Sequence, residues 1–210
     1  YHAKVTDISQ MTDLPKSFRS WLSSNYSFDL PKLCSLKQSK DGTKKWLVGL
    51  ERGNYVEMVL IPERGRNTLC VSSQVGCALK CDFCSTGKQG FKANLNTAEI
   101  VGQLILANRH LSQEGKRVSN IVFMGMGEPL LNFEAVSSAI NLFQDDCAFG
   151  LSKRKVTLST AGLVPGIMRM KETLDCSLAI SLHAPTDSVR DVLVPVNRKY
   201  PIKDLLAAAS

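Results

Sequence analysis

The sequence predicts an α/β fold, in which a parallel sheet is covered by helices and preceded by a small α+β region. Three observations predict it. From about residue 67 onward, short and nearly continuous apolar runs alternate with helical patterns, as in parallel sheets buried on both faces. Before that point the pattern is different, with one amphipathic helix and one hairpin. The chain has 210 residues, 44% of them hydrophobic, and can therefore bury a substantial core.

The accessory region is predicted over residues 1–66. Leu14, Phe18, Trp21 and Leu22 fall at helical spacing, and Pro31 closes that segment. The strand-like runs WLVGL and YVEMVLI follow, and the residues ERGN between them make a hairpin turn. We therefore expect a helix plus a β-hairpin, with a binding role and a purely structural role both open.

The core is predicted over residues 67–210 as four β/α units. The predicted strands are TLCVSS (68–73), NIVFMG (120–125), KVTLST (155–160) and SLAISLH (177–183). Thr97 is expected to cap the first helix, and further helices are expected over 133–145, after Pro165 and after Pro201. Because four units are too few to close a barrel, we interpret the core as part of a larger (β/α) barrel.

Charge and composition limit the classes of protein. The formal net charge is +7, which suits a polyanionic partner such as RNA, although short basic runs are also ordinary solvated loops. The sequence shows no apolar stretch that would span a bilayer and no signal peptide at its start. An odd number of cysteines, seven, fits a reducing compartment, so we expect a cytoplasmic protein without membrane contact. The first residue is not Met, and we expect a trimmed chain.

One cysteine motif carries most of the chemical information. Cys77, Cys81 and Cys84 have the spacing C-x3-C-x2-C within GCALKCDFCSTG. Clusters held in full normally use four cysteines, so three in one tight loop predict a cubane with one iron left without a protein ligand. Such an open iron is suited to holding a substrate or a cofactor. Phe83, just before the third cysteine, is placed to shield the cluster or an adenine ring.

Three other interpretations of these cysteines stay open at this point. A structural zinc site would need a fourth ligand, for which Cys70 is the nearest cysteine. Disulfides are disfavoured, since an odd number of cysteines leaves one thiol unpaired. Buried cysteines also cluster by chance, because a free cysteine behaves as a small hydrophobe.

Polar residues follow each predicted strand. The cysteine loop follows the first, Gly127 and Glu128 the second, Ser159 ends the third, and Ser181, Leu182 and His183 end the fourth. Ligand sites of parallel sheets gather at the carboxyl ends of the strands. Each residue alone has an ordinary interpretation as a turn, a cap or a satisfied polar group. Their shared position predicts one site.

The chain resembles the radical S-adenosylmethionine (SAM) superfamily and, more narrowly, its adenine-C2 RNA methyltransferases. The resembling strings are LCVSSQVGCALKCDFCSTGKQGF, MGMGEPLLN, LSKRKVTLSTAG and LAISLHAPTDSVRDVLVPVN. C-x3-C-x2-C is specific only to the superfamily, whereas SSQVGCALKC and GMGEPLLN are specific to the narrower group. The resemblance implies a partial (β/α) barrel of the radical SAM type.

The resemblance also implies cofactors and site residues. It implies a [4Fe-4S] cluster bound by Cys77, Cys81 and Cys84, and SAM bound at the open iron. Gly127 and Glu128 match the segment that binds the SAM amino group. The residues that match other SAM contacts are Ser159, Ser181, Leu182 and His183.

Two further residues match catalytic positions of the family. In that family a methyl-carrying cysteine forms a covalent adduct with C2 of adenine, and a second cysteine releases it by forming a disulfide. Cys70 matches the second cysteine, and Glu57 matches a carboxylate proposed as the base that removes the C2 proton. We expect such a base to be partly buried, although an acid within YVEMVLI would ordinarily face solvent. The methyl-carrying cysteine is expected beyond residue 210, so that residues 1–210 alone would not complete methyl transfer.

The implied partners are 23S rRNA, modified in the peptidyl-transferase region, and tRNA, modified next to the anticodon. An electron donor such as flavodoxin or ferredoxin and a monomeric state are also expected. Three alternatives remain: an adenine-C8 rRNA methyltransferase that confers antibiotic resistance, another radical SAM enzyme such as a glycyl-radical activase, and a zinc-containing RNA-binding module. The QGF run and LSKRKVTLSTAG favour the C2 group over the C8 group.

Overall fold

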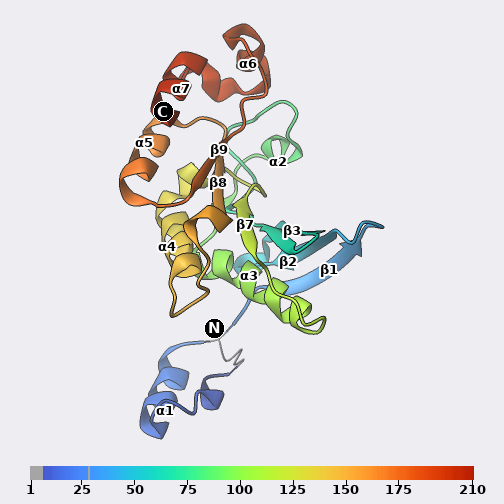
Figure 1. Ribbon diagram of the computed structural model, residues 1–210, viewed down its shortest axis with the longest axis vertical. Coiled ribbons are helices and arrows are strands. Elements are labelled where there is room, and N and C mark those ends of the chain that lie inside the picture. Colours follow the sequence, from blue (N-terminus) through green and yellow to red (C-terminus); the bar gives the residue numbers. More distant parts are fainter. Residues whose placement is uncertain (1–6, 28) are drawn as a thin grey trace.

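The computed structural model describes residues 7–27 and 29–210, and a single seven-stranded sheet organises them (Figure 1). The strand order is β1-β2-β3-β4-β7-β8-β9. The sheet strands are β1 (Lys32–Gln38), β2 (Lys44–Gly49), β3 (Tyr55–Glu63), β4 (Arg66–Cys70), β7 (Asn120–Phe123), β8 (Val156–Thr160) and β9 (Ser177–Ile180). A second, two-stranded sheet pairs β5 (Gln74–Val75) with β6 (Ala93–Asn94).

The helices alternate with the parallel strands, as the sequence predicts. They are α1 (Lys16–Asn25), α2 (Ser85–Lys88), α3 (Thr97–Ser112), α4 (Phe133–Gln144), α5 (Val164–Thr173), α6 (Asp187–Leu193) and α7 (Ile202–Ala209). In Figure 1, α4 and α5 follow one another along the same side of the sheet, while α1 lies apart from it at the bottom of the view. Among the described residues, no helix is long and apolar enough to cross a membrane.

Strand direction changes at β4. Strands β1 to β4 are antiparallel neighbours, and β4, β7, β8 and β9 are parallel. The hairpin β2–β3 shares one core with the parallel strands, because Trp46 and Met58 belong to the same buried cluster as Leu104 and Phe123. The proposed boundary between residues 1–66 and 67–210 therefore lies within β4, in the middle of a continuous sheet, and the division into two functional parts stays a prediction.

Several predicted element bounds need correction. The cap of α3 is Asn96 and not Thr97: the Asn96 side chain accepts from the Glu99 N–H at 2.8 Å, and the Glu99 carboxylate accepts from the Asn96 N–H at 2.9 Å. This capping box satisfies two N–H groups at the helix start, which a threonine one position later would not do. The predicted strands 68–73, 120–125 and 177–183 end earlier, at Cys70, Phe123 and Ile180, because the chain there turns into the rim loops. Strand β1 and helix α6 are not predicted at all.

A buried lysine links the hairpin to α3 and gives the first testable prediction. Lys44 at the start of β2 is 7% exposed, and its Nζ lies 2.6 Å from Glu114 Oε1 and 3.2 Å from His110 Nε2. Hydrogen bonds from Lys44 and Lys116 lower the pKa of Glu114 to about 2. Because this value lies below the ordinary 4.5, the ion pair stabilises the fold above about pH 4.5 and loses that contribution as the pH falls toward 2.

We expect Glu114→Gln to remove the part of the acid sensitivity of folding stability that comes from this ion pair. Urea unfolding measured at a series of pH values should show a shallower loss of stability below about pH 4.5 in the variant than in the parent protein. Glu63→Gln is the matched control, since Glu63 pairs with Arg66 in an exposed ion pair and should leave the slope unchanged. Equal slopes for the parent and Glu114→Gln would contradict the prediction.

Candidate cofactor site at the strand ends

The predicted site residues lie at the edge of the sheet where the parallel strands end. Strands β4, β7, β8 and β9 end at Cys70, Phe123, Thr160 and Ile180, and the loops that follow them are the rim loops. In Figure 1, α2 and α6 lie beyond this edge, near the end of β9. The antiparallel strand β3 runs in the opposite direction beside β4, with Val59 opposite Cys70, so its first residues reach the same edge. This brings Glu57 to the rim.

The cysteine loop is held by backbone bonds on both sides. The Cys77 N–H donates to the Gly90 carbonyl at 3.1 Å, and the Asp82 N–H donates to the Leu193 carbonyl at the end of α6 at 3.0 Å. Gly76 has φ +73°, and a Cβ there would lie 1.7 Å from the Gly90 oxygen, so only glycine fits. The loop geometry therefore depends on a close approach between residues 76 and 90.

The thiols of this loop fit an iron–sulfur cluster. All seven cysteines are free, and Cys77 is buried while Cys81 and Cys84 are half-buried. Burial raises the pKa of Cys77 and raises that of Cys81 to about 11, and the nearby Glu128 carboxylate adds to both shifts. Thiols with such pKa values bind as thiolates only where a metal compensates their charge.

The arrangement differs from that of a mononuclear metal site. Within the described residues, no group of three or more His, Cys, Asp or Glu side chains is placed to hold one metal ion. A structural zinc needs four ligands around a single point, each about 2 Å from it. A cubane distributes its thiolates over separate irons, so three ligands on one loop suit it better.

Glu128 is a buried carboxylate at the centre of the rim. It is 3% exposed, and its two oxygens accept from the Leu130 N–H at 3.2 Å and the Ala161 N–H at 2.8 Å. Burial raises its pKa, and the backbone hydrogen bonds only partly offset this effect. Within the part of the chain that the structure describes, no lysine, arginine or histidine forms an ion pair with Glu128, so this buried carboxylate is suited to binding a cationic group of a ligand.

Gly127 and Gln74 set the position of Glu128. The Glu128 N–H donates to Gln74 Oε1 at 2.9 Å. Gly127 has φ +97°, and a Cβ at this position would lie 2.5 Å from the Gln74 Cβ. The loop after β7 therefore packs against the segment after β4 at a distance that only glycine permits.

The loops after β8 and β9 are joined to each other and to the cysteine loop. Ser159 Oγ lies 3.5 Å from Ser181 Oγ, and the Ser181 N–H donates to the Thr160 carbonyl at 2.9 Å. His183 has φ +60°, and its ring lies 4.2 Å from the ring of Phe83, between centroids. Leu182 is 36% exposed beside them. The rim thus brings together all the residues that the sequence assigns to the cluster and to SAM.

The two predicted catalytic residues, Glu57 and Cys70, differ in their surroundings from the residues assigned to the cluster and to SAM. Glu57 is exposed, so the expectation of a partly buried base is wrong: Val56, Met58 and Leu60 face the core, and alternation along β3 turns Glu57 outward. Its carboxylate forms an ion pair with Lys45 at 2.9 Å. Its backbone nevertheless belongs to the rim, because the Ser72 hydroxyl donates to the Glu57 carbonyl at 2.6 Å.

Cys70 is half-buried at the end of β4, and its environment gives a second prediction. Burial raises the pKa of its thiol from 9.0 to about 11. Since the thiolate is the reactive form, we expect iodoacetamide at about pH 8 to alkylate the exposed Cys34 and Cys147 at least tenfold faster than Cys70. Peptide mass analysis of a time course would measure the rates, and equal labelling of Cys70 and Cys147 would contradict the assigned pKa.

A set of buried polar residues that supports the rim was not predicted from the sequence. The Gln103 side chain bonds both the N–H and the carbonyl of Ser72 at 2.9 Å, and the Asn132 amide donates to the Ser73 and Leu95 carbonyls. Arg190 is fully buried on α6. A polar run directly after an apolar strand, Ser72 to Gln74, is the one sequence signal that pointed to this network.

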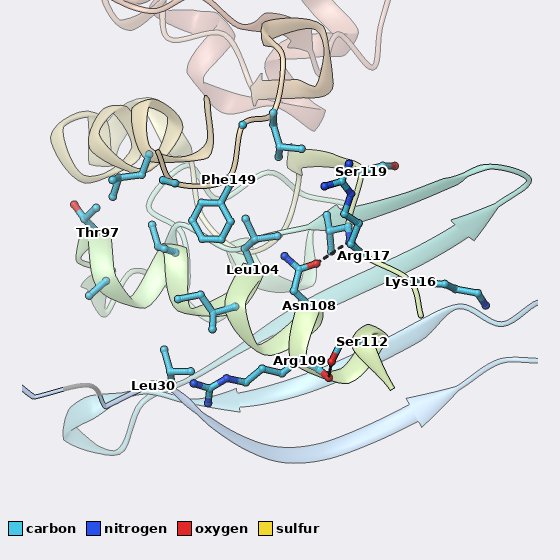
Figure 2. A pocket seen from close by; sticks show the side chains of 18 of the residues that line it. Leu30, Thr97, Leu104, Asn108, Arg109, Ser112, Lys116, Arg117, Ser119 and Phe149 are labelled. Atoms are coloured by element: carbon cyan, nitrogen blue, oxygen red, sulfur yellow. Dashed lines mark hydrogen bonds between the residues drawn. The ribbon is translucent and has the colours of Figure 1, made fainter. Parts of the chain in front are cut away.

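A separate pocket of about 980 Å³ contains none of the predicted site residues (Figure 2). It lies against α3, where Leu104 and Asn108 contribute to its lining, and Phe149 faces it from the loop after α4. Basic side chains, among them Arg109 and Arg117, also line it. Its size does not make it the chemical site, because it lacks the thiols and the buried carboxylate.

The rim defines a class of protein, a (β/α) fold with three thiols suited to an open metal cluster and a buried carboxylate at the carboxyl edge of its sheet. Comparison with known families agrees with this. The chain belongs to the radical SAM superfamily, whose family model matches residues 71–210.

Individual relatives give a more specific comparison than the superfamily model. The chain is 52% identical over 210 residues to a dual-specificity RNA methyltransferase RlmN of Alkalilimnicola ehrlichii, covering 100% of this chain and 58% of the relative. It is 55% identical over 208 residues to the RlmN of Vesicomyosocius okutanii, again covering 58% of the relative. A crystal structure of a radical SAM methyltransferase from Sphaerobacter thermophilus superimposes with a TM-score of 0.92 at 40% identity, over 99% of this chain and 62% of that one.

These comparisons confirm the predicted family resemblance and the predicted fold class, a partial (β/α) barrel of the radical SAM type. The predicted cofactors, a [4Fe-4S] cluster and SAM, are those of the superfamily. The chain spans less than three-fifths of the length of the two curated relatives described above.

Proposed function

We propose that the full-length protein methylates C2 of an adenosine in 23S rRNA and of an adenosine next to the tRNA anticodon. One observation carries the proposal: the cysteine loop, Glu128 and the loop after β9 meet at a single rim. The identity of 52–55% to dual-specificity RNA methyltransferases supports the choice of substrate class. The net charge of +7 suits an RNA partner.

The proposed roles come from the family resemblance, and the placement of the side chains supports them. Cys77, Cys81 and Cys84 hold the cluster. Glu128 and the backbone at Gly127 bind the SAM amino group, since a buried carboxylate favours a cation. The remaining proposed SAM contacts are Ser159, Ser181, Leu182 and His183. When bound, the cluster and SAM supply the radical chemistry that an electron-poor ring carbon such as adenine C2 requires.

Cys70 and Glu57 complete the proposal. Cys70 releases the protein–RNA adduct: as a thiolate its sulfur bonds the sulfur of the methyl-carrying cysteine, the bond from that sulfur to the methylene carbon breaks, and the electron pair leaves with the RNA product, which takes up a proton to complete the methyl group. Burial raises the pKa of the Cys70 thiol, so it must lose its proton for this step. Glu57 acts as the base for the C2 proton, for which it must exchange its ion pair with Lys45 for contact with the RNA. We also propose that flavodoxin or ferredoxin supplies the electron, and that the protein acts as a cytoplasmic monomer.

Anaerobic reconstitution of the full-length protein tests the proposal. We expect uptake of iron and sulfide, SAM cleavage on reduction, and C2-methyladenosine in nucleosides from treated rRNA and tRNA. Cys81→Ser should abolish cluster uptake, whereas Cys147→Ser, which changes an exposed cysteine outside the rim, should not. Stoichiometric zinc without a cluster, or C8-methyladenosine as the product, would overturn it.

Cys70 has a test of its own. If it resolves the adduct, Cys70→Ala should still cleave SAM but should accumulate a covalent protein–RNA complex that denaturing gels detect. Cys176→Ala is the matched control, because Cys176 is also half-buried with a pKa raised to about 11 but lies directly before β9, at the opposite end of that strand from the rim. Normal turnover by Cys70→Ala would contradict the assignment.

A further inference from the structure

Arg190 is a fully buried charged residue that the proposed chemistry leaves unused. It lies on α6, and 0% of its surface is exposed. Arginine is almost never fully buried unless it is paired. No ion pair joins it to a carboxylate within residues 7–27 and 29–210, and burial lowers its pKa. Hydrogen bonds must therefore offset the free-energy cost of burying its charged guanidinium.

The guanidinium bonds backbone carbonyls from two rim loops. Nε donates to the Leu182 carbonyl at 3.0 Å, and Nη2 donates to the Ser181 carbonyl at 3.4 Å. Nη2 also donates to the Ala161 carbonyl in the loop after β8. The planar fork of arginine is what allows one side chain to reach both loops at once.

The fourth contact fixes the arginine itself. Nη1 donates to Asn197 Oδ1 at 2.7 Å, and the Asn197 amide donates to Asp187 at 2.9 Å and Asp191 at 2.7 Å. Both carboxylates lie on α6, the helix that carries Arg190. The network therefore orients the guanidinium through a neutral amide.

The loops that Arg190 joins carry the proposed SAM contacts. The Ala161 N–H donates to Glu128, so the residue whose carbonyl binds Arg190 also holds the buried carboxylate. Ser181 and Leu182, whose carbonyls bind the same side chain, directly precede His183. Helix α6 contacts the cysteine loop as well, since the Leu193 carbonyl accepts from the Asp82 N–H.

We propose that Arg190 is a positioning residue that holds the loops after β8 and β9 in the arrangement that binds SAM. It acts through the backbone and does not touch the cofactor itself. The inference rests on the proposed SAM site. This role requires several N–H donors in fixed directions. Lysine, a point charge on a flexible stem, should therefore not replace Arg190 in supporting SAM binding.

The test compares Arg190→Lys and Arg190→Met in the full-length protein with its cluster reconstituted. We expect both variants to take up iron normally, because the hydrogen bonds of the Arg190 side chain go to the loops after β8 and β9 and to Asn197, and to bind SAM at least about tenfold more weakly in equilibrium dialysis. Arg198→Met, an exposed arginine eight residues further on, is the control and should bind SAM normally. Normal SAM binding by Arg190→Lys would overturn the inference, because charge alone would then be sufficient.

Hydrogen exchange of the protein without cofactors gives a second readout. The Ser181 and Ala184 amides, which donate to Thr160 and Leu182, should exchange faster in both Arg190 variants, while the amide of Leu158 within β8 stays protected. Unchanged exchange at 181–184, or an equal increase throughout the sheet, would contradict a positioning role.

If Arg190→Met does not fold, Asn197→Ala replaces it, since it releases the guanidinium but keeps the arginine. Parent protein that fails to bind SAM would refute the proposed function, and the exchange result would still report on Arg190.

Discussion

Gly127→Ala is expected to destabilise the protein by roughly 3 kcal/mol and to weaken SAM binding at least about tenfold. Two effects add. The φ of +97° costs an L-residue about 1–2 kcal/mol, and the new Cβ would lie 2.5 Å from the Gln74 Cβ and 2.8 Å from the Gln74 nitrogen. Gln74 cannot retreat easily, because its own N–H donates to the Met126 carbonyl and it pairs with Asn94 in the small sheet. The loop that carries Glu128 must therefore move.

The matched control for this prediction is Gly65→Ala. Gly65 also has a positive φ, +73°, but nothing lies within 4 Å of the Cβ that alanine would add. It should cost only the backbone strain, about 1–2 kcal/mol, and should leave SAM binding unchanged. Urea unfolding gives the stabilities, and equilibrium dialysis gives the affinities. Equal losses of stability in the two variants would show that contact with Gln74 contributes nothing.

The order of strands and helices could be predicted because short strands with buried apolar residues alternate with amphipathic helices. In β7 and β8 every second residue is buried, Ile121 and Leu158 among them, and the residues between are half-buried. The convergence of the rim followed from the same signal, since parallel strands all end at one edge. The cysteine spacing is the basis of the chemistry proposed for that edge.

Other elements left no such signal. Strand β1 is exposed along its whole length, so its sequence KLCSLKQ carries no core-facing alternation that would mark it as a strand. Arg190 lies in a short charged helix that reads as a solvated surface, and its burial depends on carbonyls contributed by residues 161, 181 and 182. Contacts of this kind depend on the three-dimensional arrangement and not on local pattern.

For Glu57, the local strand pattern and the family resemblance predicted different surroundings. The alternation in β3 indicated a solvent-facing side chain, and the family resemblance indicated a catalytic base that we expected to be partly buried. The structure agrees with the alternation, and it also explains how an outward residue reaches the rim: β3 runs antiparallel to β4, so its first half extends past the end of β4. Exposure in the free protein is compatible with the proposed role of Glu57, because a large substrate can cover an exposed side chain.

Glu128→Gln is the second substitution with a large expected effect, and its size should depend on pH. Both carboxylate oxygens accept a backbone N–H, from Leu130 and from Ala161. An amide has only one acceptor oxygen, so one of these buried N–H groups would face another donor, at a cost of about 1–3 kcal/mol. Glu134→Gln, an exposed glutamate at the start of α4, is the control and should cost little.

The pH dependence follows from the direction of the pKa shift. Burial raises the pKa of Glu128 above its ordinary 4.5, so the folded protein binds a proton that the unfolded chain has already released. The stability of the parent protein should therefore fall as the pH rises from about 4.5 through the folded pKa, whereas glutamine does not titrate. We expect the stability difference between the parent and Glu128→Gln, measured by urea unfolding, to shrink as the pH rises from about 4.5 through the folded pKa. A difference that stays constant would mean that the carboxyl group titrates normally despite its burial.

Binding of a cationic ligand changes the balance, because it favours the ionised form of the buried Glu128 carboxylate. If Glu128 binds the amino group of SAM, the ammonium stabilises the carboxylate, lowers its pKa and offsets the cost of burying its charge. SAM affinity of the parent should then rise with pH through the folded pKa, and that rise should be absent in Glu128→Gln. The same titration with S-adenosylhomocysteine, which keeps the amino group but lacks the sulfonium charge, separates the two cations of the cofactor. A pH-dependent rise with both ligands assigns the effect to the amino group, and a rise with SAM alone would contradict that role for Glu128.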